Sequence, residues 1–199
     1  VAHAETGVTT NEIVIGQDID MSGTIALRMK PLMQAADAYL DEVNRRGGVH
    51  GRKIRVLRTD SANKPDKTKD NVKKLVEKDG VFAMWGISGT GNVGVALPYL
   101  TEKKVPLIGT TSGAESYYSK TYPYLINIKA SYADEIRRLA SHFHALGINR
   151  VGLIYLNNGF GREALKSAQS AAREQKLEVV GISAFKEDGS NVDEAVAPI

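Results

Sequence analysis

An α/β fold with parallel sheets flanked by helices is the architecture that this sequence predicts. Apolar, β-rich segments alternate with amphipathic helical patterns from one end of the chain to the other, which is typical of consecutive strand–helix units. The 199 residues are 42% hydrophobic, so the chain can bury a substantial core. Several of the apolar segments run directly into turns rich in glycine and hydroxyl residues. Such turns are expected where a buried strand is followed by a helix.

The first 127 residues are predicted to form an N-terminal α/β lobe. Apolar stripes with helical spacing follow each of its first three strands, and the stripe of the first helix contains Leu32, Ala36, Leu40 and Val43. Gly47 and Gly48 end that helix, and Pro65 suits the first turn of the next one. The expected strands cover 12–18, 53–59, a segment from Val81 and 105–109, and the expected helices cover about 31–46, 65–77 and 92–102.

Residues 128–199 are predicted to be the first part of a second α/β lobe. After a short extended piece at 124–129, Ile136, Leu139, Ala140 and Phe143 recur with the spacing of a buried helix face. A strand at 150–156, a helix at about 162–175, a strand at 177–185 and the start of a helix at Val192 follow. Two strands and two helices are too few to close a covered parallel layer. We therefore expect this chain to be part of a longer protein.

Bulk properties exclude several classes of partner. The net charge of +3 comes from 26 basic and 23 acidic residues that are scattered along the chain, without the basic face typical of nucleic-acid binding. No apolar run approaches the roughly 20 residues of a membrane-spanning helix, and cysteine is absent. The segment Ala2–His3–Ala4 has the small-x-small form of a signal-peptidase site. We expect an exported protein that neither spans the membrane nor binds nucleic acid.

Two loops with similar chemistry are the strongest functional signal. The segment 81–94, VFAMWGISGTGNVG, leads from a strand into glycines and hydroxyls and then into a helix, and the strand at 105–109 leads into Thr110, Thr111, Ser112 and Gly113. Helix N-terminal amides bind anions, and hydroxyls beside them donate to carboxylates. Two such loops can converge on one small carboxylated ligand. The alternative is that the hydroxyls only cap their own helices.

The triplet Gly89, Gly91 and Gly94 matches the dinucleotide fingerprint G-x-G-x-x-G. That fingerprint belongs in the first strand–helix turn, with an acidic residue at the end of the next strand. Here it lies in the third unit, and the next strand ends in Gly109 and Thr110. The sequence therefore does not favour a nucleotide site, and the glycines are explained by tight packing.

No catalytic or metal site is predicted. His142 and His144 stand two residues apart on one helix, so they point in different directions. Asp18, Asp20 and Asp60 follow the ends of the first two strands, where they can form a carboxylate cluster or act only as turn and cap residues. No G-x-S-x-G nucleophile turn occurs. We expect a protein that is not an enzyme and needs no cofactor.

Several stretches resemble one known family. They are IVIGQDIDMSG at 13–23, DEVNRRGGVHGRKIRV at 41–56, KKVPLIGTTSGAE at 103–115, SYADE at 131–135 and NNGFGREAL at 157–165. In their order and spacing the chain resembles the extracytoplasmic (periplasmic) solute-binding proteins of ABC transporters, in the branched-chain amino-acid (Leu/Ile/Val) binding family. The resemblance implies the type I periplasmic-binding fold, in which two α/β lobes joined by a hinge close on a ligand. The first crossing between the lobes is expected near 127–131.

The resemblance also implies binding roles. Family members use a hydroxyl residue after the third strand, here Thr90, and a carbonyl and an amide after the fourth, here Thr111 and Gly113. Amino-acid binders usually carry threonine at the latter position, and Phe160 stands where branched-chain binders commonly have a tyrosine. The candidate ligand-binding residues are Ser22, Ser88, Gly89, Thr90, Thr111, Ser112, Gly113, Tyr132 and Phe160.

These roles predict the solute-binding component of an ABC importer. Its ligand is expected to be a small carboxylated solute, which is a branched-chain or other amino acid or an aromatic or aliphatic acid, and its partner a membrane permease. We expect a periplasmic monomer. The alternative is a ligand-sensing receptor or regulator domain of the same fold.

Overall fold

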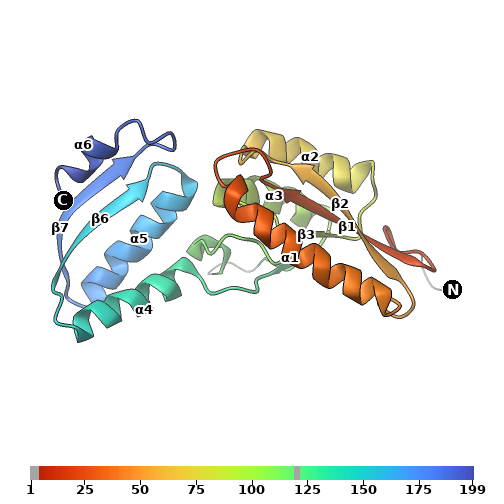
Figure 1. Ribbon diagram of the computed structural model, residues 1–199, viewed down its shortest axis with the longest axis horizontal. Helices are drawn as coiled ribbons and strands as arrows, with labels where there is room; N and C mark the ends of the chain where they lie inside the picture. Colours follow the sequence, from red (N-terminus) through yellow and green to blue (C-terminus); the bar gives the residue numbers. More distant parts are fainter. Residues whose placement is uncertain (1–4, 119–121) are drawn as a thin grey trace. The chain divides into compact units, whose positions relative to one another are not determined.

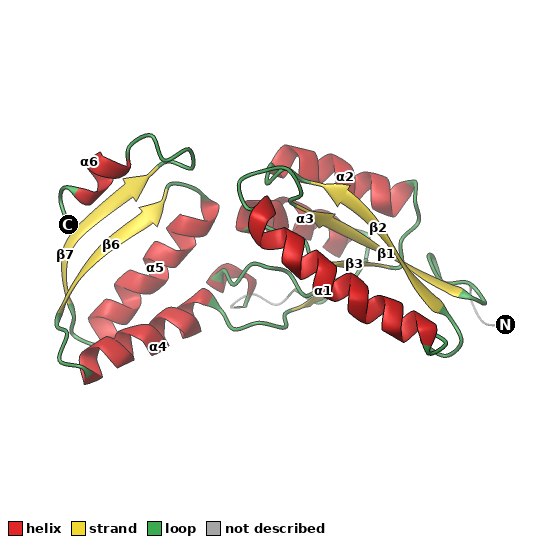
Figure 2. Cartoon of the chain, in the orientation of Figure 1, coloured by secondary structure: helices red, strands yellow, loops and turns green. Residues whose placement is uncertain are grey.

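The computed structural model describes residues 5–118 and 122–199 (Figures 1 and 2). The chain divides into two compact units. Unit 1 is Val1–Thr111 with Tyr122–Ile128, and unit 2 is Ser112–Thr121 with Lys129–Ile199. Compared with the expected lobes at 1–127 and 128–199, residues 112–121 group with the second unit rather than the first. The signal-peptidase triplet at 2–4 lies outside the described residues.

Unit 1 contains a five-stranded sheet in the order β2-β1-β3-β4-β5, and every neighbouring pair is parallel. The strands are β1 (Glu12–Ile19), β2 (Lys53–Asp60), β3 (Ala83–Trp85), β4 (Leu107–Ile108) and β5 (Leu125–Ile126). The register of β1 against β2 runs from Glu12 opposite Lys53 to Ile19 opposite Asp60. The predicted α/β class with a parallel sheet is therefore confirmed. The loops that follow β1, β3 and β4 all leave from the same edge of this sheet.

Among the described residues of unit 1, three helices cover the sheet. They are α1 (Ala26–Arg45), α2 (Pro65–Glu77) and α3 (Thr90–Glu102), and α1 lies on one side of the sheet with α2 and α3 on the other (Figure 2). Pro65 opens α2 as predicted, because its fixed φ suits a first helical turn. The predicted stripe of α3 is confirmed, with Val93, Ala96, Leu97 and Leu100 all buried.

Helix α1 differs from its prediction at its start. It begins at Ala26 and carries Pro31 in its interior, and its buried residue is Met29, while Leu32 is 54% exposed. The prediction that Leu32 faces the core is wrong because the side of the helix that packs on the sheet is centred on Met29. The predicted end is confirmed, since Gly47 has a φ of +101° and the Gly48 N–H bonds the Val43 carbonyl at 2.9 Å.

Unit 2 contains a two-stranded parallel sheet of β6 (Arg150–Leu156) and β7 (Glu178–Phe185). Its helices are α4 (Tyr132–Ala145), α5 (Gly159–Glu174) and the short α6 (Val192–Val196), and a 3₁₀ turn, η1 (Glu115–Tyr117), belongs to the same unit. Ser131 caps α4 by accepting from the Asp134 N–H at 3.1 Å. Asn158 caps α5 by accepting from the Gly161 N–H at 3.0 Å. Side-chain caps therefore define where both long helices begin.

The fully buried side chains in the core of unit 2 are mostly small, and larger apolar side chains such as Ile136 and Phe143 pack around them. Ala140 on α4 packs with Ala171 and Ala172 on α5 and with Leu177. The prediction that Leu139 faces inward is wrong, because that side chain is 50% exposed. The alanines form the centre of the buried cluster, and Leu139 lies at its margin, where it lines an apolar cavity of about 290 Å³.

Candidate functional site

The loops after β3 and β4 are hydrogen-bonded to each other within unit 1. The Thr111 N–H donates to the Ile87 carbonyl at 3.2 Å, and the Gly89 N–H donates to the Thr111 Oγ1 at 3.2 Å. A hydroxyl oxygen that accepts a bond still has its own proton to donate. Gly89 and Thr111 are therefore brought together from two segments that the sequence predicts to converge.

Gly89 occupies a position that only glycine fits. Its φ is +89°, and a Cβ built there would lie 2.6 Å from the Asn63 Oδ1 and 3.2 Å from the Asn92 Nδ2. Asn92 donates to the Ser88 carbonyl at 2.8 Å and so closes the turn. This close packing accounts for the glycine without any nucleotide. Thr90 follows as the first residue of α3, and it is 7% exposed.

Ser88 connects the same loop to the end of β1. The side chain is fully buried, its Oγ accepts from the Asp20 N–H at 2.8 Å, and the Ser88 N–H donates to the Asp18 carbonyl at 3.2 Å. Both bonds are internal to the protein, so this serine fixes the loop that presents Thr90.

The β1–α1 loop is organised by two carboxylates. Asp20 accepts bonds from the backbone N–H groups of Ser22, Gly23 and Ile25, and Asp60 accepts the Ser22 hydroxyl proton at 2.6 Å. Ser22 itself is exposed. It therefore lies at the surface in an orientation that Asp60 determines.

The pKa of the Asp60 carboxyl lies well below its ordinary value. Burial raises this pKa, but hydrogen bonds from Ser22, Met21, Ala62 and Lys67 outweigh it. Of the two interpretations left open by the sequence, the observed bonds to Asp20 and Asp60 match the turn and cap roles. Within the described residues, no group of three or more histidine, cysteine or acidic side chains is arranged to hold a metal ion.

Asp18 is a fully buried carboxyl at the end of β1. Its Oδ1 accepts from Thr59 at 2.9 Å and from Asn71 at 2.7 Å, whereas its Oδ2 lies near the Thr68 hydroxyl without the geometry of a hydrogen bond. Burial raises the pKa of this carboxyl because the charged form loses its hydration.

In unit 2 the segment after Thr111 is fixed to the start of α4. The Gly113 carbonyl accepts from the Tyr132 N–H at 2.6 Å, and the buried Ser112 Oγ accepts from the Ala114 N–H at 3.3 Å. A Cβ at Gly113 would lie 2.6 Å from the Lys129 Nζ and 2.8 Å from the Tyr132 Cδ1. The space beside Gly113 is thus already filled by an ammonium and a ring.

Tyr132 and Phe160, at the starts of α4 and α5, form an edge-to-face pair. Their ring centres lie 5.3 Å apart with an interplanar angle of 84°, the geometry that aromatic quadrupoles favour. Phe160 is 42% exposed. Sequence reasoning predicted both side chains for the site but missed Lys129, whose Nζ lies 4.8 Å from the centre of the Tyr132 ring. The only signal for Lys129 is its nearness in sequence to Tyr132.

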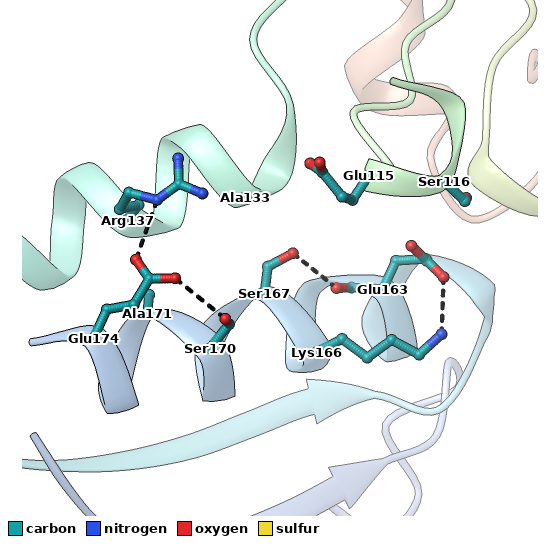
Figure 3. Close-up of a pocket in the computed structure, with 10 residues that line it drawn as sticks. All are labelled: Glu115, Ser116, Ala133, Arg137, Glu163, Lys166, Ser167, Ser170, Ala171 and Glu174. Atoms are coloured by element: carbon teal, nitrogen blue, oxygen red, sulfur yellow. Dashed lines mark hydrogen bonds and ion pairs between the residues drawn. The ribbon is translucent and has the colours of Figure 1, made fainter. Parts of the chain in front are cut away.

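A separate polar cavity of about 430 Å³ lies between η1, α4 and α5 (Figure 3). Its charged side chains pair largely with one another: Arg137 contacts Glu174 at 3.3 Å, and Lys166 contacts Glu163 at 3.1 Å. None of the predicted site residues lines it. This cavity is distinct from the loops described above.

The family model described as "Periplasmic binding protein" matches residues 12–199. The chain belongs to the periplasmic binding protein family. The solved structures described below share its fold. Comparison with curated proteins gives no match. Among the described residues no helix is both long and apolar enough to cross a membrane.

Solved structures of several proteins are similar to this periplasmic binding protein. A substrate-binding periplasmic protein from Ralstonia solanacearum is 29% identical, with a TM-score of 0.85 over 93% of this chain and 52% of that one. A solute-binding protein from Rhodopseudomonas palustris BisB5, solved with 3,4-dihydroxy benzoic acid, is 24% identical. Its TM-score is 0.78, and the match covers 88% of this chain and 47% of that one. A fatty acid ABC transporter substrate-binding protein from Thermomonospora curvata is 24% identical. Its TM-score is 0.85, and the match covers 98% of this chain and 50% of that one. The chain thus spans about half the length of these proteins.

Proposed function

We propose that this protein is the solute-binding component of an ABC importer and that it captures a small carboxylated solute in the periplasm for delivery to a membrane permease. The observation that carries the proposal is the pair of bonds between the β3–α3 loop and Thr111. They bring a threonine hydroxyl beside the N-terminus of α3, where backbone N–H groups and the helix dipole favour an anion.

Each unit is proposed to supply candidate contacts for the solute. In unit 1, Thr90 and Thr111 donate hydroxyl protons to the carboxylate, and Ser22 contacts the remainder of the solute. In unit 2, the Gly113 amide and the Tyr132–Phe160 pair complete the contacts. Ser88, Gly89 and Ser112 are assigned to positioning these loops, because the hydrogen bonds of Ser88 and Ser112 and the backbone of Gly89 are internal to the fold.

Aromatic and aliphatic acids are the proposed solutes ahead of amino acids. The aromatic pair supplies an apolar surface, and Gly113 lacks the hydroxyl that the resemblance implies for amino-acid binders. The names of similar solved proteins include 3,4-dihydroxy benzoic acid, benzoate and fatty acid, and one is described as a possible leucine/isoleucine/valine-binding protein, so both candidate classes have similar relatives. Branched-chain and other amino acids, which the sequence places first, are the second candidate class here.

The test is a thermal-shift screen of the complete protein with benzoate, octanoate and leucine. A ligand at 100 times its dissociation constant adds about 2.7 kcal/mol of stability, which gives a clear rise in melting temperature. Thr90→Ala is expected to weaken carboxylate binding about 10-fold or more, because a charge-assisted hydrogen bond is lost. Thr101→Ala, near the other end of α3, is the matched control. Unchanged affinity in Thr90→Ala, or turnover of a solute without stable binding, contradicts the proposal.

A further inference from the structure

We infer that the Lys129 ammonium is an anion-binding group of this site and takes the place of a side chain at position 113. The inference rests on the proposed function and deepens it, because it assigns a charged group to the recognition of the solute's carboxylate. The ligand class that fits is an aromatic carboxylate, with its anion at Lys129 and its ring against Tyr132 and Phe160.

Lys129 is held in one place by three contacts within unit 2. Its Nζ donates to the Ala130 carbonyl at 3.0 Å and to the Glu135 Oε1 at 2.9 Å, and it lies 4.8 Å from the centre of the Tyr132 ring. An ammonium has three N–H donors, and no described residue accepts from the third. The side chain is 31% exposed, so an incoming anion can reach it.

The Lys129 ammonium occupies the space that a side chain at position 113 would fill, because Gly113 has no Cβ. A Cβ at position 113 would come within 2.6 Å of the Lys129 Nζ and 2.9 Å of the Tyr132 Cε1. A side chain at 113 and the observed position of Lys129 therefore exclude each other. The Lys129 ammonium therefore provides a charged N–H donor next to position 113, which suits a carboxylate.

The surroundings favour a carboxylate attached to a flat apolar group. The Tyr132 and Phe160 rings meet edge to face, and the ammonium approaches the Tyr132 ring within the range of a cation–π contact. Glu135 already shares the ammonium, but its side chain is 50% exposed, and an exposed ion pair contributes little free energy. A solute carboxylate can therefore compete with Glu135 for Lys129.

The experiment is calorimetric titration of the complete protein with benzoate, octanoate and leucine, each compared with its neutral amide. Lys129→Gln is expected to lower benzoate affinity about 10- to 100-fold, the range of a charge-assisted hydrogen bond, and to leave benzamide affinity unchanged. Lys129→Arg is expected to retain most of the affinity, because it keeps the charge. Glu135→Gln is expected to tighten benzoate binding, because it removes the competing carboxylate.

The matched control is Lys103→Gln. Lys103 also lies over a tyrosine ring, 5.7 Å from the centre of Tyr99, but near the C-terminal end of α3. The Lys103→Gln variant is expected to bind every solute with the affinity of the wild type.

The outcomes separate the two proposals. If Thr90→Ala weakens benzoate binding and Lys129→Gln does not, the role of Lys129 is overturned and the proposed function stands. If leucine binds and benzoate does not, the aromatic class is overturned. If the wild-type protein binds no acid of the panel, both proposals fail.

Discussion

The Ser88 Oγ accepts a 2.8 Å hydrogen bond from the Asp20 N–H, across 68 positions of sequence. With the bond from the Ser88 N–H to the Asp18 carbonyl, it joins the β3–α3 loop to the end of β1. The position of Thr90 is thus determined by residues that are themselves fully buried. Substitutions in this buried layer are expected to affect stability and solute affinity together.

Ser88→Ala is expected to destabilise the protein by about 1–3 kcal/mol, because it leaves the Asp20 N–H buried without an acceptor. Urea denaturation measures the change. Ser170→Ala is the control, since the Ser170 hydroxyl contacts Glu174 at the exposed surface, and its effect is expected within about 0.5 kcal/mol. Equal unfolding midpoints for the wild type and Ser88→Ala would show that the bond does not stabilise the loop.

Asp18→Asn is expected to raise the melting temperature at pH 7 by a few degrees. Burial raises the pKa of Asp18 above its ordinary value of 3.8, so the folded state binds this proton more tightly than the unfolded chain does. Ionisation then removes stability as the pH rises above 3.8 toward the raised pKa. An amide avoids the charge, keeps the acceptor for Thr59 and Asn71, and places a donor where Oδ2 has no partner.

The measurement is the melting temperature of both proteins from pH 3 to pH 7. The melting temperature of Asp18→Asn is expected to equal that of the wild type near pH 3 and to exceed it by a growing margin as the pH rises. Asp41→Asn, on the exposed side of α1, is the control and is expected to show no such divergence. Parallel curves for wild type and Asp18→Asn would contradict the prediction.

Gly89→Ala is expected to destabilise the protein by more than about 1 kcal/mol and to weaken solute binding. The cost has two parts, the φ of +89° and the contact of a new Cβ with Asn63 at 2.6 Å. Gly47→Ala separates them, because Gly47 has a φ of +101° with nothing within 4 Å of its Cβ position. Thermal unfolding of the two variants gives the contact cost by difference, and equal losses would show that the backbone conformation alone matters.

The strand and helix pattern of unit 1 was predictable because its periodicity is strong. The α3 stripe from Val93 to Leu100 is apolar at the core-facing positions, Val93, Ala96, Leu97 and Leu100, that the structure buries. The face of α1 was not predictable in the same way, since Met29 and Leu32 are both apolar and only packing on the sheet decides which is buried. Leu139 presents the same ambiguity beside Ala140.

The candidate site was predictable in its loops but not in its side-chain orientations. The strand ends predict that the segments at Gly89 and Thr111 approach each other, and the structure joins them by hydrogen bonds. A sequence does not distinguish a serine that faces inward, such as Ser88, from one at the surface, such as Ser22. Lys129 is positioned by the Tyr132 ring, the Ala130 carbonyl and the Glu135 carboxylate. No local sequence pattern predicts those three contacts.

The division of each unit into two stretches of chain affects the order in which the protein can fold during synthesis. β5 pairs with β4 through Leu107 opposite Leu125 and Ile108 opposite Ile126, yet residues 112–121 between these strands belong to unit 2. The sheet of unit 1 therefore cannot be completed on the ribosome until part of unit 2 has already emerged. A chain truncated after Thr111 would lack β5 and leave the edge of β4 unpaired, so no single cut yields both units whole.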